Sequence, residues 1–302
     1  MSAAPVVSVV IATRNRRQLL SETIATVTEQ TLGDWELIVV DDASTDDTIP
    51  HLETIDDRRI FTLRQEVHGE RSAARNAGLA AARGEFVMFL DDDDLLRPAA
   101  LDHLVRALRA QPDAVAASGA CRILHRNGDS VKVYRPAEER TRIIWRELLF
   151  GWWSNSGQNL YRTATIREIG GFDHALVPCE DRKLWLAVAL RGPVCLVPSV
   201  VMEYRQHDGQ SKPPNVDEIR QSVWRDFISG LPSTRQPEAR RIRRASELVE
   251  RAESARVAGR FGAAFAMYVQ ACWLAPHLLR SPLTGRPLWW GLRKSLLRVR
   301  AL

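Results

Sequence analysis

The stretch Phe86-Val87-Met88-Phe89-Leu90-Asp91-Asp92-Asp93-Asp94 places five apolar residues directly before four consecutive carboxylates. An apolar run of this length, set off by Gly84, predicts a strand that is buried on both faces of a sheet. Pro98 suits the first turn of a following helix, so we expect the aspartates on a short strand-to-helix turn. Ligands of open α/β sheets bind at the carboxyl ends of strands, which is where this turn lies.

The four aspartates, Asp91 to Asp94, have two interpretations. Adjacent carboxylates repel one another, and a hard divalent cation with oxygen ligands relieves that repulsion. The alternative is a solvated acidic turn without a ligand. Their position at the end of a buried strand favours the metal site.

Strands and helices alternate on both sides of this central stretch. Apolar runs predict strands at 6–12, 35–40 and 60–63, and helical spacing predicts helices at 16–30, 72–83 and 98–110. Alternation of this kind predicts right-handed crossovers and a mainly parallel, Rossmann-like sheet flanked by helices. The expected fold class is therefore α/β.

The second half of the chain changes character. Asn127-Gly128 predicts a type I′ hairpin, 141–150 predicts a helix, and Glu180-Asp181 opens a helix through about Leu190. A polar, proline-rich linker at 211–215 precedes a region with an all-helical pattern. We therefore expect two parts, a domain at 1–210 and a helical C-terminal extension at 217–302.

The composition narrows the function classes. The chain has 302 residues, of which 45% are apolar and 26% charged, as is typical of a soluble globular protein. Arginines crowd the final third, and basic surfaces attract phosphate-bearing partners. No aromatic-interleaved basic motif accompanies them, so nucleic acid is not an expected partner. Four scattered cysteines without a CxxC pair, and no secretory signal, predict a cytoplasmic protein.

Polar side chains follow three of the predicted strands. Thr13-Arg14-Asn15 follows the first strand and Asp41-Asp42 the second, in addition to the four aspartates after the central strand. In a parallel sheet these tips share one edge, so they can converge on a single ligand. Threonine, asparagine and aspartate can bind a base and ribose, and no glycine-rich phosphate loop is present. The pattern favours a nucleotide held by acids and a metal, although Asp41 and Asp42 alone are also explained as helix caps.

Several segments together resemble the family-2 glycosyltransferases, in the order that the family shows. They are Val9–Arg16, Val39–Asp46, Arg75–Gly78, Gly84–Asp94, Gly170–Asp173 and Glu180-Asp181. The resemblance covers about residues 6 to 210. It implies a GT-A fold, a nucleotide-diphosphate sugar donor, with UDP-sugars expected first, a Mn²⁺ or Mg²⁺ cofactor, and transfer with inversion at the anomeric carbon.

The resemblance also implies roles for single residues. Nucleotide-binding residues would be Thr13, Arg14, Asn15, Asp42, Arg71, Arg75, Asp91 and Asp92. Metal ligands would be Asp93 and His207, and the catalytic base would be Asp181, with Glu180 as its rival. If the resemblance is set aside, Glu180 and Asp181 are explained as ordinary first-turn acids of a helix. Arg71 and Arg75 are then explained as solvated arginines, and His207 is explained as a surface histidine.

The chemistry that sugar transfer requires agrees with this set of residues. A carboxylate can take the proton of an attacking hydroxyl, and a divalent ion can stabilise the leaving diphosphate. The acceptor would be a glycan, a lipid-linked glycan or another molecule. Trp289-Trp290 with Arg293-Lys294 predicts either peripheral contact with an anionic membrane at its inner face or a tail packed on the catalytic domain. Two other functions remain open: a catalytically silent nucleotide-sugar-binding protein and a sugar nucleotidyltransferase.

Overall fold

The computed structural model describes residues 4–125, 130–134, 140–207, 210 and 215–277. The predicted hairpin turn Asn127-Gly128, most of the linker and the tail with Trp289 and Trp290 lie outside these residues. The chain forms two compact units: residues 1–143 with 154–219, and residues 144–153 with 220–302. The segment 144–153 thus belongs with the C-terminal helices, although it precedes much of the first unit in the sequence.

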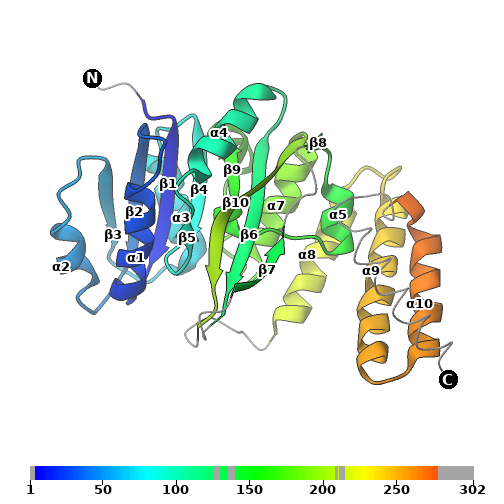
Figure 1. The fold of residues 1–302 in the computed structure, drawn as a ribbon. Helices are drawn as coiled ribbons and strands as arrows, with labels where there is room; N and C mark the ends of the chain where they lie inside the picture. Colours follow the sequence, from blue (N-terminus) through cyan, green and yellow to red (C-terminus); the bar gives the residue numbers. More distant parts are fainter. Residues whose placement is uncertain (1–3, 126–129, 135–139, 208–209, 211–214, 278–302) are drawn as a thin grey trace. The chain divides into compact units, whose positions relative to one another are not determined.

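Within the described residues, the first unit is built on one ten-stranded sheet with the order β3-β2-β1-β4-β9-β6-β10-β5 (Figure 1). Strand β7 pairs with β6, and β8 pairs with β10. The first four strands in this order run parallel to one another. They are β3 (Ile60–Gln65), β2 (Trp35–Asp42), β1 (Val7–Thr13) and β4 (Phe86–Asp91). Their carboxyl ends therefore meet at one edge, as the sequence predicts.

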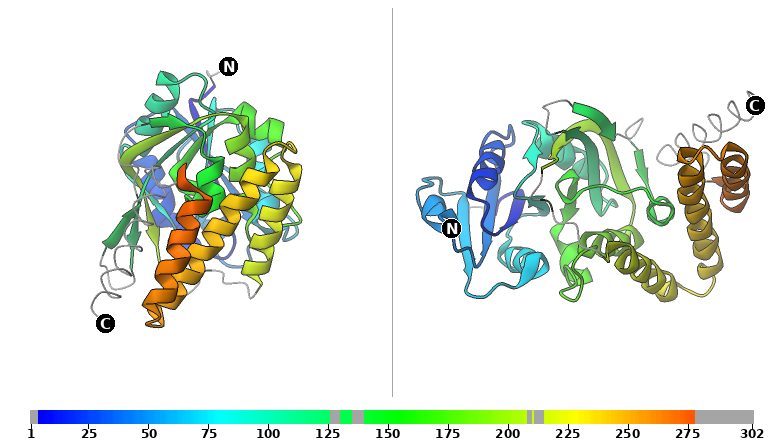
Figure 2. Two further views of the ribbon diagram at one scale, coloured as in Figure 1. Left: turned by 90° about the vertical axis from the view of Figure 1, so that its right-hand side faces the viewer. Right: turned by 90° about the horizontal axis from the view of Figure 1, so that it is seen from below.

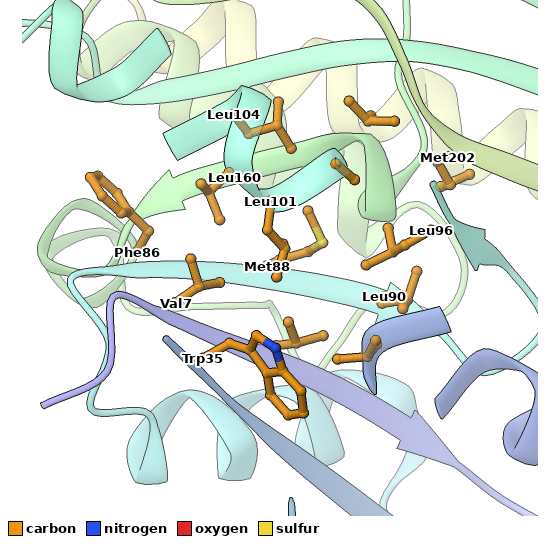
Figure 3. Close-up of a cluster of buried hydrophobic side chains, with 14 of the residues drawn as sticks. Val7, Trp35, Phe86, Met88, Leu90, Leu96, Leu101, Leu104, Leu160 and Met202 are labelled. Atoms are coloured by element: carbon orange, nitrogen blue, oxygen red, sulfur yellow. The ribbon is translucent and has the colours of Figure 1, made fainter. Parts of the chain in front are cut away.

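The central strands are apolar on both faces because helices cover both. On one face, α1 (Arg17–Thr28) and α4 (Ala100–Ala110) pack on the sheet. Figure 3 shows the buried cluster formed there by Val7, Trp35, Phe86, Met88, Leu90, Leu96, Leu101, Leu104, Leu160 and Met202. On the other face, α3 (Glu70–Ala81) lies so close that a Cβ on Gly78 would come within 2.3 Å of a Val10 methyl carbon. Glycine at this position lets the helix backbone approach the sheet.

Beyond β4 the sheet is mixed. Strand β9 (Asn159–Arg162) lies antiparallel between β4 and β6 (Ala116–Leu124), and β10 (Val194–Arg205) runs parallel to β6. These strands extend the sheet away from the parallel part. The remaining elements of the unit are α2 (Thr48–Glu53), β7 (Ser130–Tyr134), a short 3₁₀ turn η1 (Ser156–Gln158), α6 (Thr163–Ile169) and α7 (Glu180–Arg191).

Two local predictions were wrong. The four aspartates do not lead directly into a helix, because Leu95-Leu96 forms strand β5, which pairs with Met202 and Glu203 of β10 before α4 begins. The helix expected at 141–150 is also shorter. Strand β8 (Arg140–Arg142) pairs with β10, and the helix α5 covers only Trp145–Phe150. In both places β10, a strand distant in the sequence, supplies backbone hydrogen bonds, and at Thr141-Arg142 these outweigh the local helical pattern.

The second unit is helical, which confirms the expected C-terminal helical extension. It contains α5, most of α8 (Val216–Gly230), α9 (Gln236–Val257) and α10 (Phe261–Leu274), with α9 and α10 side by side (Figure 1, Figure 2). A two-pronged ion pair joins α5 to α9: Arg146 Nε and Nη2 donate to Glu238 at 2.6 and 3.0 Å. Among the described residues, every helix lacks the combined length and apolarity that crossing a bilayer requires.

Candidate functional site

A pocket of about 340 Å³ opens at the carboxyl edge of the parallel strands. It is lined mainly by charged and polar side chains that come from the ends of β1, β2 and β4, from α3 and from the end of β10. They are Thr13, Arg14, Arg16, Asp42, His68, Glu70, Arg71, Arg75, Asp91, Asp92, Asp93, Tyr204 and Gln210, with Ala12. The structure thus brings eight of the twelve sequence-predicted site residues into one pocket. Asn15, Glu180, Asp181 and His207 lie outside this lining.

Arg16 holds the middle of the acidic turn. Its Nη1 lies 3.0 Å from Asp92 Oδ1 and 2.8 Å from Asp93 Oδ2, while Thr13 Oγ1 donates to Asp92 Oδ2 at 2.8 Å. Burial raises the pKa of Asp92 to about 6 in spite of the nearby Arg16 charge. Sequence reasoning missed Arg16, although it directly follows the predicted Thr13-Arg14-Asn15 tip.

Asp91, Asp93 and Asp94 form a candidate metal centre. Each offers a carboxylate oxygen, and these oxygens lie within 4.8 Å of one another. Asp94 is fully buried, and its Oδ2 atom has no hydrogen-bond partner in the described part of the chain. Burial raises the pKa of Asp94, and the charges of Asp91 and Asp93 raise it further. A buried, unsatisfied oxygen beside two further carboxylates fits a hard divalent cation, which takes oxygen ligands.

The end of β10 closes over the same turn. His207 Nε2 lies 2.8 Å from Asp93 Oδ2, so the predicted histidine does meet the predicted metal ligand. Arg205 donates from its guanidinium to the Asp93 carbonyl and pairs with Glu22 of α1. Its backbone N–H also lies 3.3 Å from Asp94 Oδ1. These bonds fix the backbone of the acidic turn.

Asp42 lies in the pocket with both carboxylate oxygens engaged. Oδ2 is 2.6 Å from His68 Nδ1, and Oδ1 accepts a hydrogen bond from the Gly69 N–H at 2.7 Å. Glu70 Oε1 lies 3.2 Å from the other ring nitrogen of His68. The sequence gives little indication of His68, because a histidine before a helix has no distinctive pattern.

Asn15 joins two loops at the site edge. Its Oδ1 accepts from the Thr45 N–H at 2.7 Å, and its own N–H donates to Ser44 Oγ at 2.9 Å. Its φ of 53° is left-handed, as is that of Ala43 in the second of these loops. Strained backbone of this kind persists where surrounding contacts hold it, and it is concentrated at functional sites.

Arg75 links the acidic turn to α7. Its Nη2 lies 2.5 Å from Asp91 Oδ1, and its Nη1 lies 2.9 Å from Glu180 Oε1. Burial disfavours the charged form of Arg75, but Asp91 and Glu180 outweigh it and raise the pKa of the guanidinium. Arg71 Nε is farther from Glu180 Oε1, at 3.6 Å. Burial raises the pKa of Glu180 in spite of these arginines.

Asp181 follows Glu180 on α7 but has different surroundings. It is half-buried, and its Oδ1 accepts from the Arg182 N–H at 2.7 Å. Among the described residues, no cation lies at ion-pair distance from its carboxylate. It lines a separate small cavity of about 10 Å³ together with Phe89, Tyr161 and Trp185. Phe89 lines this cavity and Asp91 lines the larger pocket; the two are alternate residues of β4, so their side chains leave the same face of the strand.

Comparison with known proteins gives the family. Residues 8–168, more than half of the chain, match the family described as Glycosyl transferase family 2. The chain is 31% identical over 188 residues to the uncharacterized protein y4gI of Sinorhizobium fredii, a match that covers 60% of this chain and 20% of that protein. It is 32% identical over 167 residues to the GalNAc(5)-diNAcBac-PP-undecaprenol beta-1,3-glucosyltransferase of Campylobacter jejuni, covering 54% of this chain and 53% of that enzyme.

A solved structure extends the match to the whole fold. The Staphylococcus aureus TarS fragment 1-349 in complex with UDP-GlcNAc superposes with a TM-score of 0.67 at 18% identity, covering 98% of this chain and 91% of that one. This likeness confirms the GT-A type fold. The chain therefore belongs to glycosyl transferase family 2.

Proposed function

We propose that the protein is a metal-dependent, inverting glycosyltransferase that moves a sugar from a nucleotide-diphosphate donor to an acceptor hydroxyl. UDP-sugars are the first donors to test, since the TarS fragment was solved with UDP-GlcNAc. The observation that supports the proposal best is the single pocket that gathers the acidic turn, Asp42 and several arginines at one sheet edge. Transfer from such a donor needs acids to bind the metal, polar groups to bind the nucleoside and cations to bind the diphosphate.

The metal would be held by Asp93 with Asp91 and Asp94, whose oxygens already lie close together. Mn²⁺ or Mg²⁺ at this place would stabilise the negative charge of the departing diphosphate as a Lewis acid. Asp92 would serve the ribose instead, because it is not part of this group of close oxygens and its carboxylate is bound by Thr13 and Arg16. His207 would support Asp93 through the contact at 2.8 Å.

The nucleotide would lie across the ends of β1 and β2. Thr13 and Asp42 would face the nucleoside, and Arg14 and Arg71, both in the pocket lining, would approach its phosphates. Asn15 would act indirectly, since its side chain binds the loop after β2. Arg75 would hold Asp91 in place, because its guanidinium is buried between two carboxylates.

Asp181 is the proposed catalytic base. Glu180 is committed to Arg75, whereas the Asp181 carboxylate keeps an oxygen that can accept a proton. The acceptor oxygen would attack the anomeric carbon while its proton passes to Asp181. The bond from that carbon to the diphosphate breaks, and the electron pair leaves with the nucleoside diphosphate.

The acceptor would be a glycan or a lipid-linked glycan. The name of the Campylobacter relative describes a glycan on undecaprenol diphosphate. An acceptor of that kind would place this chain at the cytoplasmic face of a membrane, in peripheral contact with anionic lipid.

The test is donor hydrolysis and sugar transfer with UDP-sugars, with and without Mn²⁺ or Mg²⁺. Asp93→Ala and Asp181→Asn should each lower the rate by a factor of about 100 or more. Asp56→Asn, which alters an exposed loop carboxylate, is the matched control and should keep full activity. If both site variants match the wild type, the site assignment is wrong. Tight donor binding without turnover would instead indicate a binding protein, and pyrophosphate release from a nucleoside triphosphate a nucleotidyltransferase.

A further inference from the structure

Helix α10 is apolar on two opposite sides. Its 14 residues, Phe261–Leu274, include no acidic or basic side chain. Ala264, Tyr268 and Ala271 form the buried side, which packs on α9. The opposite side consists of Gly262, Ala266, Val269 and Trp273, which we call the outer face.

The outer face is exposed although it is apolar. Val269 is 46% exposed and Trp273 is 80% exposed. Positions 262, 266, 269 and 273 follow helical spacing, so the four residues form one continuous stripe. By contrast, the exposed side of α9 carries the charged residues Arg240, Arg244, Glu247 and Arg251. A helix that is apolar all round is normally covered on every side, but within the described residues nothing covers the outer face of α10 at Val269 and Trp273.

The dimensions of α10 favour a surface contact over insertion across a bilayer. Fourteen residues of helix extend about 21 Å, whereas the hydrocarbon core is about 30 Å thick. An apolar helix face beside basic residues is the pattern of segments that lie in the interface of a membrane, with tryptophan at the level of the headgroups.

Charge distinguishes a lipid surface from a second copy of the chain. Residues 261–302 include no aspartate or glutamate, and the basic residues Arg280, Arg286, Arg293, Lys294, Arg298 and Arg300 follow α10 in the sequence. A second copy would bring the same positive charges against these six, which repel one another. Anionic lipid attracts them, and stable membrane binding ordinarily combines an apolar signal with a polybasic one.

A cavity beside Trp273 fits the same partner. It has a volume of about 240 Å³ and is lined by Trp273 together with Arg241, Glu238 and His277, among others. Glu238 is already paired with Arg146, so Arg241 can offer its charge to a lipid phosphate. Cation and tryptophan therefore meet at one end of the outer face.

We propose that the outer face of α10 docks in the headgroup region of an anionic membrane. This deepens the peripheral contact in the proposed function by naming the surface that makes it. Vesicle binding needs neither donor nor acceptor, so failure of this proposal and failure of the transfer reaction are measured separately.

The experiment is co-sedimentation of the full chain with phosphatidylcholine vesicles, with and without phosphatidylglycerol. Binding should require phosphatidylglycerol and weaken as salt is raised. The double variant Val269→Glu with Trp273→Glu should bind at least about tenfold more weakly, because it places two acids in the apolar face. Val257→Glu is the matched control: this residue is 79% exposed on α9, and its variant should bind like the wild type.

Circular dichroism should show the same helix content for all three proteins, since every altered side chain is exposed. Equal binding of the double variant and the control would overturn the proposal, and so would binding that ignores phosphatidylglycerol. Light scattering that shows a dimer dissolved by Trp273→Glu would assign the outer face to a second copy and overturn it as well.

Discussion

Arg75 forms ion pairs with the carboxylates of two separate segments. It is buried, and its fork reaches Asp91 at the sheet edge and Glu180 at the start of α7. Arg75→Met should lower the free energy of unfolding by about 3 to 5 kcal/mol, because it removes the closest partner of the buried Glu180 carboxylate and leaves it only Arg71 at 3.6 Å. Arg75→Lys should recover part of this loss, since an ammonium keeps the charge but cannot form the fork. Urea unfolding of the chain without ligands measures both changes.

Arg71→Met is the control for this experiment. Arg71 is partly exposed and lies 3.6 Å from the same Glu180 oxygen, so its loss should cost less than about 1 kcal/mol. If Arg71→Met and Arg75→Met were equally stable, the link that we assign to Arg75 would be absent.

For some site residues the sequence predicts the position in the structure, and for others it does not. Asp91 to Asp94 and Thr13 follow apolar runs, so position alone places them at the sheet edge, where the structure has them. Arg71 and Arg75 could not be told apart from sequence, because one helical turn separates two residues of the same chemistry. Arg16 and His68 were missed, since the contacts with Asp92, Asp93 and Asp42 that bring them into the site are made between loops far apart in the chain.

At the scale of elements, the close approach of α3 to the sheet positions Arg75. A Cβ at Gly78 would lie 2.3 Å from Val10 Cγ1 and 3.2 Å from Val40 Cγ2. Gly78→Ala should therefore push the helix outward and destabilise the protein by about 1 to 3 kcal/mol, with a loss of transfer rate. Thermal unfolding and the transfer assay measure these effects.

Gly262→Ala in α10 is the matched helical control. Apart from its chain neighbours and the backbone of its own helix, no atom of the described residues lies within 4 Å of the added Cβ, so the change should stabilise the helix by about 1 kcal/mol. Similar effects of the two substitutions would show that the spacing between α3 and the sheet is not the determinant.

The ion pair between α5 and α9 has a predictable pH dependence. The hydrogen bonds from Arg146 lower the pKa of Glu238 below its usual value of 4.5. A lowered carboxylate pKa gives stability that is present above pH 4.5 and is lost as the pH falls through the folded-state value. Glu238→Gln should thus be less stable than the wild type at neutral pH by about 1 kcal/mol or less.

This difference should disappear in acid, where the wild-type carboxylate is also neutral. Urea unfolding at several pH values measures it, with Arg146→Gln as the partner variant. A stability difference that stays constant through acid would mean that the charge of Glu238 is not its source.

Helices and strands could be predicted from the sequence where a local residue pattern determines their type. They could not be predicted where pairing with a distant strand determines it. The strands around β1 have apolar runs that fix their type, and their alternation with helices fixes their parallel order. Strand β9 lies between β4 and β6 and runs antiparallel to both. No residue pattern within Asn159–Arg162 predicts this direction. Strand β5 was expected to be part of a turn, and most of β8 part of a helix, because their partner, β10, lies about 50 to 100 residues further along the chain.

At the scale of the whole molecule, the two compact units have separate cores. Residues 1–143 with 154–219 contain the sheet and the pocket, and residues 144–153 with 220–302 contain α9 and α10. Units with separate cores can unfold in separate steps. Scanning calorimetry of the full chain should show two transitions, which variants in each unit can assign.

Ligand addition then tests where the nucleotide binds. UDP with Mn²⁺ should raise the temperature of one transition only, because a ligand that binds the folded state stabilises the unit that contains its site. A concentration of 100 times the dissociation constant corresponds to about 2.7 kcal/mol. Asp93→Ala should abolish the shift that requires Mn²⁺, and Glu238→Gln should lower the other transition without changing the response to UDP. A ligand shift of the transition that Glu238→Gln lowers would place the nucleotide site in the helical unit and contradict the assignment to the sheet edge.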